Sequence, residues 1–426
     1  MKQLTFVVLV FPSVSFMAKS TISELFDWLD SSPTPFHAVA TAEERLTAHG
    51  YVEQKSLAQP LEKKGYLIQD GAIVAWSLGE KNAPFRIIGA HTDSPNLRIQ
   101  PQPDIRTAGW SQLGIEIYGG VLLNSWLDRD LGIAGRVVSS DGTSHLFGDA
   151  SSLVRLPQLA IHLDRDVNER GVQLDKHAHT IPVWGTFAPP FESWLADVSE
   201  CDDIVAFDAH LFDNTPASIL GVDGSLIASA RLDNQLSCWA AVEALAMTDS
   251  SFNVIVVLND HEEVGSESIT GAGGPLLETV VHAVMDTHGT TSGERHDVLR
   301  QSWCLSADNA HAVHPNYQER HDPRHGPIVN NGPALKLNGN QRYATTARGA
   351  AHLTNVAQSA GVPLQTFVSR NNMPCGSTIG PITSTRLGIE AIDIGVPQLS
   401  MHSARELCGA EDPLHLVSLM QEFVSR

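Results

Sequence analysis

Apolar residues recur at helical spacing in two segments near the amino terminus, residues 21–29 and 37–49, and a proline-rich turn separates them. Each segment is therefore predicted to be a helix with one buried side. Two short, mostly apolar segments follow, at 73–78 and 85–89, and their length and composition are typical of strands. The opening of the chain thus predicts an α/β arrangement.

The pattern changes after Pro95. From about residue 97 to 227 the chain contains short β-like pieces separated by Gly, Pro and Asp turns, without alternation between strands and helices. The alternation returns with a predicted helix at 229–247 and a strand at 253–258, and it continues to a terminal helix from Pro413. The middle of the chain is therefore predicted to differ in architecture from its two ends.

These patterns predict two domains, as expected for 426 residues, which is more than a single core usually holds. We predict an α/β domain built from residues 17–96 and 228–426, with a mostly β domain, residues 97–227, inserted between them. Residues 1–16 are predicted to be an extension, either disordered or upstream of the true start, because Pro12 interrupts their apolar run and only one lysine precedes it.

The composition excludes some classes of function. The chain has 48 acidic and 28 basic residues and a net charge of −20, which argues against nucleic-acid binding because phosphates would be repelled. No stretch is long and apolar enough to predict a membrane span. The five cysteines are dispersed without paired spacing, which is typical of reduced thiols and argues against a zinc–thiolate site. A cytoplasmic location, without membrane or nucleic-acid partners, is therefore expected.

Two adjacent carboxylates, Glu262 and Glu263, closely follow the apolar strand 253–258. Functional groups collect at the carboxyl ends of parallel strands, where one carboxylate is suited to bind a metal and the other to transfer protons. Acidic loops are more often simply solvated, so the pair alone is weak evidence. The spacing also leaves open which of the two glutamates is the base.

Four other fragments supply the remaining parts of a two-metal site. Each follows an apolar strand or starts a helix, and they are His91-Thr92-Asp93, Leu232-Asp233-Asn234, Asp308-Asn309-Ala310-His311 and Met401-His402-Ser403. Imidazoles and carboxylates are the expected ligands of zinc, manganese or cobalt. A bridging Asp, with one His and one further carboxylate per ion, would give each ion three protein ligands.

Each of these residues also has a structural alternative. Asp233 is suited to cap the helix that follows it, and Asp308 to end a strand. A histidine after a strand is more often a hydrogen-bonded structural residue than a ligand. Asp93 lies where it would accept the second ring N–H of His91 and fix the tautomer of that ring. The five fragments together, rather than any one of them, predict the site.

Seven longer stretches contain or accompany these fragments. They are AHTDSPNLRIQP (90–101), RLDNQLSC (231–238), HEEVGSES (261–268), ADNAHAVHPNY (307–317), PALKLNGNQRYAT (333–345), PCGSTIGPITSTRLG (374–388) and IDIGVPQLSMHSARE (392–406). As a set they resemble the M18 family of metalloaminopeptidases, the aspartyl aminopeptidase group. The likeness begins at Ile22 and implies a mixed-sheet α/β/α zinc-peptidase domain with an inserted, mostly β dimerisation domain.

The resemblance implies two divalent metal ions per subunit, with zinc as the first choice and manganese or cobalt as alternatives. By the family pattern, Asp233 bridges the ions, and Glu262 is the general base that acts on a water bridging them. The other implied ligands are His91 and Asp308 for one ion, and Glu263 and His402 for the other. The family also implies a homo-oligomer in which dimers assemble into a dodecamer.

Three further residues match family positions outside the metal ligands. His162 is implied to reach the active site of the neighbouring subunit and to stabilise the oxyanion there; zinc contact and a buried structural role are the alternatives. Lys336 and Tyr343 match substrate-contacting positions, where a cation would pair with an acidic side chain. The alternative for Lys336 is an ordinary surface lysine.

The implied activity is hydrolysis of the first peptide bond of peptides with a free amino terminus. A preference for N-terminal Asp or Glu follows only from the resemblance and from Lys336, and a preference for leucine-like residues is an alternative. A related metal-dependent carboxypeptidase or N-deacylase is another alternative. An inactive scaffold is disfavoured because none of the implied ligands is lost.

Overall fold

The structure is a computed structural model that describes residues 16–426. The two predicted amino-terminal helices are present as α1 (Phe16–Ser31) and α2 (Pro35–Ala48), and α1 begins earlier than the sequence pattern indicated. The extension expected over residues 1–16 lies, apart from its last residue, outside the described residues. No helix in the described part of the chain is long and apolar enough to cross a membrane.

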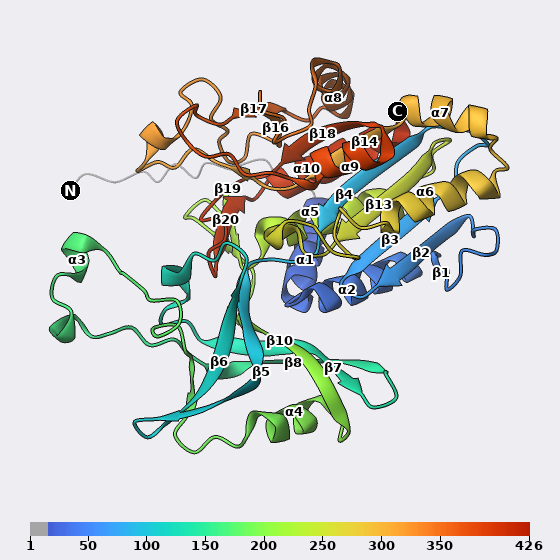
Figure 1. The fold of residues 1–426 in the computed structure, drawn as a ribbon. Coiled ribbons are helices and arrows are strands. Elements are labelled where there is room, and N and C mark those ends of the chain that lie inside the picture. The colour runs from blue at the N-terminus through green and yellow to red at the C-terminus, as the bar shows by residue number, and fades with distance from the viewer. Residues whose placement is uncertain (1–15) are drawn as a thin grey trace, which may run out of the picture.

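The largest sheet has nine strands and confirms the predicted mixed-sheet α/β fold (Figure 1). Its four central strands, β13, β4, β14 and β18, are parallel, whereas β3 runs antiparallel to β13 and β16 runs antiparallel to β18. In sheet order the strands are β1 (Val52–Glu53), β2 (Lys64–Gln69), β3 (Ala72–Ser77), β13 (Asn253–Asn259), β4 (Phe85–His91), β14 (Trp303–Ala307), β18 (Glu390–Gly395), β16 (Ala334–Leu337) and β17 (Gln365–Val368).

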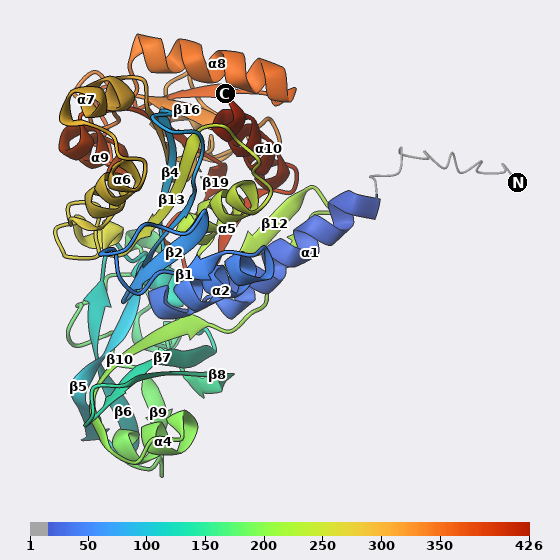
Figure 2. The same cartoon turned by 90° about the vertical axis from the view of Figure 1, so that its right-hand side faces the viewer.

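Helices cover both faces of this sheet, and Figure 2 shows the two helical layers from the side. Alternate residues of each central strand point to opposite faces, so a continuous apolar run such as β13 serves two cores. One core is formed with α1, α2, α5 (Leu232–Ala246), α8 (Ala347–Ala360) and α10 (Asp412–Ser425). The other is formed with α6 (Leu276–Thr287), α7 (Ser292–Arg300) and the end of α9 (Ile379–Leu387).

A separate antiparallel sheet of six strands lies beside this α/β unit and has a hydrophobic core of its own. All of its strands come from the middle of the chain, and α4 (Phe191–Ser199) packs on it. In sheet order they are β8 (Ser144–Val154), β7 (Leu131–Ser139), β10 (Ile204–Asp213), β5 (Asn96–Thr107), β6 (Trp110–Tyr118) and β9 (Val183–Gly185). The predicted limits of an inserted domain, 97 and 227, and its role in dimerisation stay predictions.

Two smaller features complete the fold. Between β8 and β9 the chain extends outward as an arm that carries the short helix α3 (Val167–Arg170) (Figure 1). A third sheet of five strands combines segments from residues 218–229 with segments from residues 310–409, and the sequence pattern did not predict it. Its strands are β11 (Ser218–Leu220), β12 (Leu226–Ser229), β20 (Glu406–Gly409), β19 (Pro397–Leu399) and β15 (Ala310–His311).

Candidate metal centre

The ends of three neighbouring parallel strands bring most of the candidate ligands together. His91 is the last residue of β4, and Asp308 follows β14 directly. Glu262 and Glu263 begin the short 3-10 helix η3 (Glu262–Val264) just beyond β13. Because these strands are adjacent and parallel, their carboxyl ends meet at one edge of the sheet, as expected for functional groups in α/β proteins.

Asp233 and His402 reach the same place from other elements. Asp233 lies at the start of α5, where the backbone is not yet helical, and His402 lies in the turn between β19 and β20. Asp233 is buried, with 3% of its surface exposed, and its two carboxylate oxygens face different histidines. The structure therefore brings all five predicted metal ligands into one cluster.

The cluster divides into two groups of three that share Asp233. In the first, Nε2 of His91 is 3.5 Å from Oδ1 of Asp233 and 3.8 Å from Oδ1 of Asp308. In the second, Nε2 of His402 is 3.6 Å from Oδ2 of Asp233 and 3.3 Å from Oε1 of Glu263. Within each group the potential ligand atoms all lie within 4.8 Å of one another, and a third group joins His91 with Glu262 and Glu263.

This geometry fits bound divalent cations. Atoms that are about 2.0–2.2 Å from a tetrahedral zinc ion lie roughly 3.3–3.6 Å apart, close to the separations found here. Oδ1 of Asp233 is buried without a hydrogen-bond partner among the described residues, which leaves it available as a ligand atom. Mixed imidazole and carboxylate donors suit zinc, and also manganese or cobalt.

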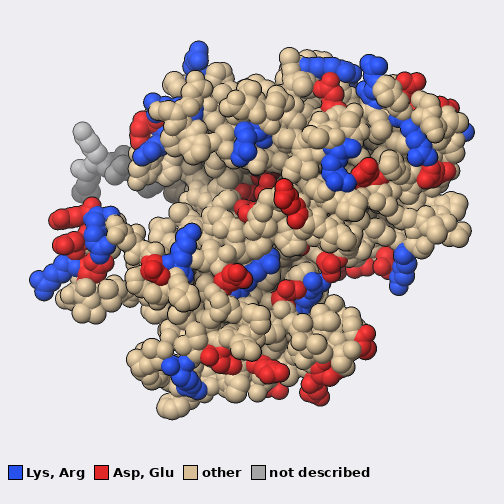
Figure 3. Space-filling view, in the orientation of Figure 1, with Lys and Arg blue, Asp and Glu red and all other residues tan. Residues whose placement is uncertain are grey.

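The carboxylates outnumber the positive charges around them. Burial raises the pKa of Glu262 to about 8, with the charge of Asp308 as a further cause, and burial likewise holds the pKa of Glu263 well above its usual range. Burial alone would lower the pKa of His402, but Asp233 and Glu263 outweigh it and raise that pKa to about 10. Figure 3 shows acidic side chains in a hollow near the middle of this face. The excess of negative charge favours cation binding.

Asp93 supports the centre from a fully buried position. Nδ1 of His91 is 3.0 Å from the backbone oxygen of Asp93 and 3.4 Å from its Oδ1. The main chain therefore makes the closer contact with the ring, whereas the carboxylate was expected from the sequence. The carboxylate accepts hydrogen bonds from the backbone N–H groups of Glu262 and Glu263. It also accepts one from the hydroxyl of Tyr118, at 2.7 Å.

Glu406 is a buried residue of the site that the sequence analysis did not single out. Its Oε2 accepts a hydrogen bond from the backbone N–H of Asp233 at 2.8 Å, and its Oε1 accepts one from the backbone N–H of His402 at 2.7 Å. Burial, with the charge of Asp233, raises the pKa of Glu406 to about 8. The only feature of the sequence that pointed to Glu406 was the spacing of an acidic residue four positions after the candidate ligand His402.

The three residues predicted outside the metal ligands have different surroundings. Lys336 is buried, with its Nζ 3.3 Å from Oδ2 of Asp308 and 5.3 Å from the ring centre of Tyr343, so it is not a surface lysine. Tyr343 is buried as well. His162 is exposed on the arm after β8 and belongs to none of the groups of potential metal ligands found among the described residues.

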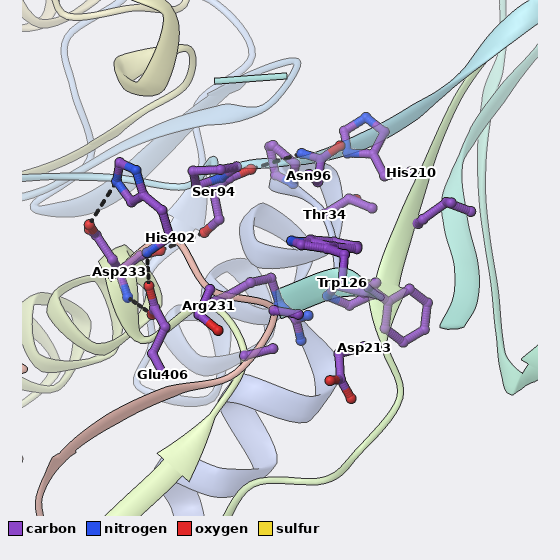
Figure 4. A pocket seen from close by; sticks show the side chains of 18 of the residues that line it. Thr34, Ser94, Asn96, Trp126, His210, Asp213, Arg231, Asp233, His402 and Glu406 are labelled. Carbon is purple, nitrogen blue, oxygen red and sulfur yellow. Dashed lines mark hydrogen bonds and ion pairs between the residues drawn. The ribbon is translucent and has the colours of Figure 1, made fainter. Parts of the chain in front are cut away.

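A cavity borders the centre on the side of the six-stranded sheet (Figure 4). Asp233, His402 and Glu406 line it on one side, and Trp126 and His210 line it on the other. Two of the candidate ligands, Asp233 and His402, therefore lie at the boundary between the two large sheets.

Comparison with known proteins adds independent findings. The family model described as Aminopeptidase I zinc metalloprotease (M18) matches residues 28–424. A protein of Streptomyces coelicolor called probable M18 family aminopeptidase 2 is 46% identical over 426 residues, covering 94% of this chain and 96% of that protein. A chain in the solved complex of Ape4 and Nbr1 matches with a TM-score of 0.91 and 35% identity, over 96% of this chain and 86% of that chain. The mApe1 dodecamer of S. cerevisiae matches with a TM-score of 0.83 and 29% identity, over 96% of both chains.

Proposed function

The chain belongs to the M18 family of aminopeptidases, which are zinc metalloproteases and hydrolyse peptide bonds, and we propose that its catalytic centre is the cluster around Asp233. The single observation that carries this proposal is the position of Asp233, whose two oxygens face His91 and His402 from within two separate groups of potential ligands.

The proposal assigns two divalent cations to each subunit. His91 and Asp308 would hold one, Glu263 and His402 the other, and Asp233 would bridge them. Zinc is proposed because the family model describes zinc metalloproteases, and manganese or cobalt would suit the same donors. When bound, such a pair lowers the pKa of a shared water and polarises the peptide carbonyl.

Glu262 is the proposed general base and acid. Its carboxylate would accept the proton of the attacking water as the new C–O bond forms, and would then donate that proton to the nitrogen of the leaving amine as the peptide C–N bond breaks. Support comes from its position, because Glu262 lies with His91 and Glu263 in one of the groups of potential ligands, and burial raises its pKa. The contact of its backbone with Asp93 holds it in place.

We propose a preference for N-terminal Asp or Glu, with Lys336 as the cation that an acidic side chain would approach. Its support is a buried ammonium group beside the candidate ligand Asp308. The same observation also favours a second candidate, a preference for leucine-like residues, because Asp308 already neutralises part of the charge of Lys336. The two therefore need a direct experiment.

The experiment is a panel of aminoacyl-anilides carrying Asp, Glu, Leu or Ala, assayed with zinc-, manganese- and cobalt-loaded protein. Higher kcat/KM for Asp and Glu, lost in Lys336→Met, supports the acidic preference, whereas higher kcat/KM for Leu supports the second candidate. A peptide with a free amino terminus is compared with its acetylated form. Preferential cleavage of the acetylated form would indicate a deacylase or carboxypeptidase-like activity and would overturn the proposal.

A homo-oligomer built from dimers, as a dodecamer, is also proposed, and the solved mApe1 dodecamer supports it. In this assembly His162 would act in the site of the neighbouring subunit, which agrees with its exposed position on the arm. Mixing two inactive variants, His162→Ala and Glu262→Gln, and letting subunits exchange tests this role. Restored activity in the mixture supports it, and no restoration despite measured exchange contradicts it.

A further inference from the structure

The end of strand β6 contacts the candidate metal centre at several points. We infer that residues 118–122, from Tyr118 to Leu122, form a positioning element through which the six-stranded sheet fixes the spacing of the metal ligands. This inference rests on the function proposed above, because it assumes that the cluster around Asp233 binds metal ions.

The first contact is made by the side chain of Tyr118. Its hydroxyl donates a hydrogen bond to Oδ2 of Asp93 at 2.7 Å, and both residues are buried. The same carboxylate accepts hydrogen bonds from the backbone N–H groups of Glu262 and Glu263. Through Asp93, Tyr118 therefore acts on the loop at the end of β13, which carries the proposed base Glu262 and the proposed ligand Glu263. Tyr118 does not contact the carboxylate of either glutamate.

The second contact is made by the backbone. Nδ1 of His402 lies 3.1 Å from the carbonyl oxygen of Gly120, an arrangement in which Nδ1–H donates and Nε2 is left facing Asp233 and Glu263. The N–H of Leu122 in turn donates to the carbonyl oxygen of His402 at 3.0 Å. Both the ring and the backbone of this candidate ligand are thus held by residues 118–122.

The absence of side chains at two positions makes this close approach possible. A Cβ atom at Gly120 would lie 3.1 Å from Nδ1 of His402, and one at Gly119 would lie 3.1 Å from Cβ of Glu263. Gly119 also has a φ of +72°, which favours glycine. Glu263 as well as His402 is therefore packed directly against this short backbone.

The ring of Tyr118 is itself fixed from the six-stranded sheet. The guanidinium group of Arg98, on the neighbouring strand β5, stacks on it at 3.6 Å from the ring centre. Tyr118 is paired with Asn96 on the same strand. A shift of this sheet relative to the α/β unit would therefore move both Asp93 and His402. Asp93 supports His91, a proposed ligand of one ion, and His402 is a proposed ligand of the other.

The first test compares two buried tyrosines. Tyr118→Phe removes the hydroxyl that contacts Asp93, and Tyr51→Phe removes a buried hydroxyl that donates at 2.8 Å to the backbone of Leu245, outside the metal centre. Zinc binding is measured without substrate, by competition with a chromophoric chelator. We expect zinc affinity and kcat to fall about tenfold in Tyr118→Phe, with little change in KM, because groups that orient ligands typically contribute 10- to 100-fold. Tyr51→Phe is expected to change zinc affinity less than about twofold by the same measure.

The second test uses two glycines. Gly120→Ala places a methyl group against the ring of His402, whereas Gly293→Ala, in α7, adds a methyl group with no atom within 4 Å. Because His402 is proposed to serve only one ion, Gly120→Ala should weaken one zinc equivalent by at least about tenfold and leave the other unchanged. Gly293→Ala should bind both equivalents as the unchanged protein does.

Failure of this inference is distinguishable from failure of the proposed function. Asp233→Asn is titrated with zinc in parallel. If Asp233→Asn loses zinc while Tyr118→Phe and Gly120→Ala behave like their controls, the role of residues 118–122 is refuted and the metal centre stands. If Asp233→Asn binds zinc as tightly as the unchanged protein, both proposals are overturned.

Discussion

At the scale of single residues, the adjacent glutamates Glu262 and Glu263 differ in their contacts. Oε1 of Glu263 lies 3.3 Å from Nε2 of His402, within a group of potential ligands that contains Asp233. Glu262 has no such ion pair with a histidine among the described residues, and its backbone is fixed by Asp93. This difference supports the assignment of Glu263 as ligand and Glu262 as base, which the spacing in the sequence left open.

We expect Glu262→Gln to keep its metal and lose activity. The amide preserves the shape of the side chain but is unable to accept and return a proton, and general acid–base catalysis contributes about 10²- to 10⁴-fold to rates. The expected result is a kcat at least about 100-fold lower with unchanged zinc content by elemental analysis. Glu267→Gln, an exposed acid in the following loop, serves as the control. Activity within a factor of two of the unchanged protein would remove Glu262 from the role of base.

Glu406 leads to a prediction about stability. Gln at this position keeps one carbonyl oxygen, so one of the two backbone N–H groups that Glu406 satisfies, those of Asp233 and His402, is left unpaired in a buried place. Such a loss costs about 1–3 kcal/mol. Glu406→Gln should lower the free energy of unfolding by this amount in urea titrations and weaken zinc binding, whereas the exposed Glu411→Gln should do neither. Equal stability of both variants would contradict this account.

Local spacing identified ligand candidates but not their supports. His91 and Asp93 are two positions apart, and Glu262 and Glu263 are adjacent, so short sequence motifs identify these residues as candidates. The contact between Glu406 and Asp233 joins residues 173 positions apart through a backbone N–H, and no residue pattern reports such a bond. Tyr118 was missed for the same reason. Lys336 was expected at the substrate, but its burial beside Asp308 becomes evident only in the folded chain.

At the scale of secondary structure, strand ends explain why the candidate ligands converge. The strands β4 and β13 are buried throughout and mostly apolar, and both were predicted, because a central strand is buried on both faces. The start of α5 was not, because the predicted helix began at 229, where β12 ends instead. Arg231 intervenes with a left-handed φ of 58°, and a single apolar stretch gives no sign of such a reversal.

Helix α2 gives a pH-dependent prediction. Burial, with the positive charge of Arg231, lowers the pKa of His37 near the start of this helix to about 4. In the unfolded chain the pKa is about 6.5, so between these values the unfolded chain binds more protons. The contribution of His37 to the free energy of unfolding should therefore be fully present above about pH 6.5 and should decrease by about 3 kcal/mol as the pH drops to about 4.

The measurement is urea unfolding at pH 7.5, 6 and 5. His37→Gln should show a smaller loss of stability over this range than the unchanged protein, because it removes one group that takes up a proton on unfolding. His296→Gln, which alters an exposed histidine, should lose as much stability over this pH range as the unchanged protein does. The same acid sensitivity in both variants would mean that His37 does not contribute.

At the scale of the whole molecule, bound cations are expected to stabilise the fold. The potential ligands of the candidate centre come from both the amino- and carboxyl-terminal parts of the chain, and the mutual repulsion of their carboxylates opposes folding. A ligand present at 100 times its Kd stabilises a protein by about 2.7 kcal/mol. Treatment with a chelator should therefore lower Tm by several degrees in calorimetry, and added zinc should restore it. Asp233→Asn should lack this response, and a chelator-insensitive Tm in the unchanged protein would contradict the prediction.

The overall architecture could be predicted only in part from the sequence. The change of pattern after Pro95 predicted a mostly β middle section, and the six strands of one sheet do come from residues 96–213. The third sheet was missed because its strands are short, and because β12 pairs with β20 and β15 with β19 across large separations in the sequence. The arm that carries His162 was not predicted either, since an exposed, irregular segment has no periodicity.

The order of the strands in the nine-stranded sheet has a consequence for biosynthesis. β4, which ends in His91, lies between β13 and β14, so its two neighbours emerge from the ribosome only after the whole six-stranded sheet has been made. His402 follows later still. The proposed catalytic centre is therefore incomplete until nearly the whole chain has been synthesised.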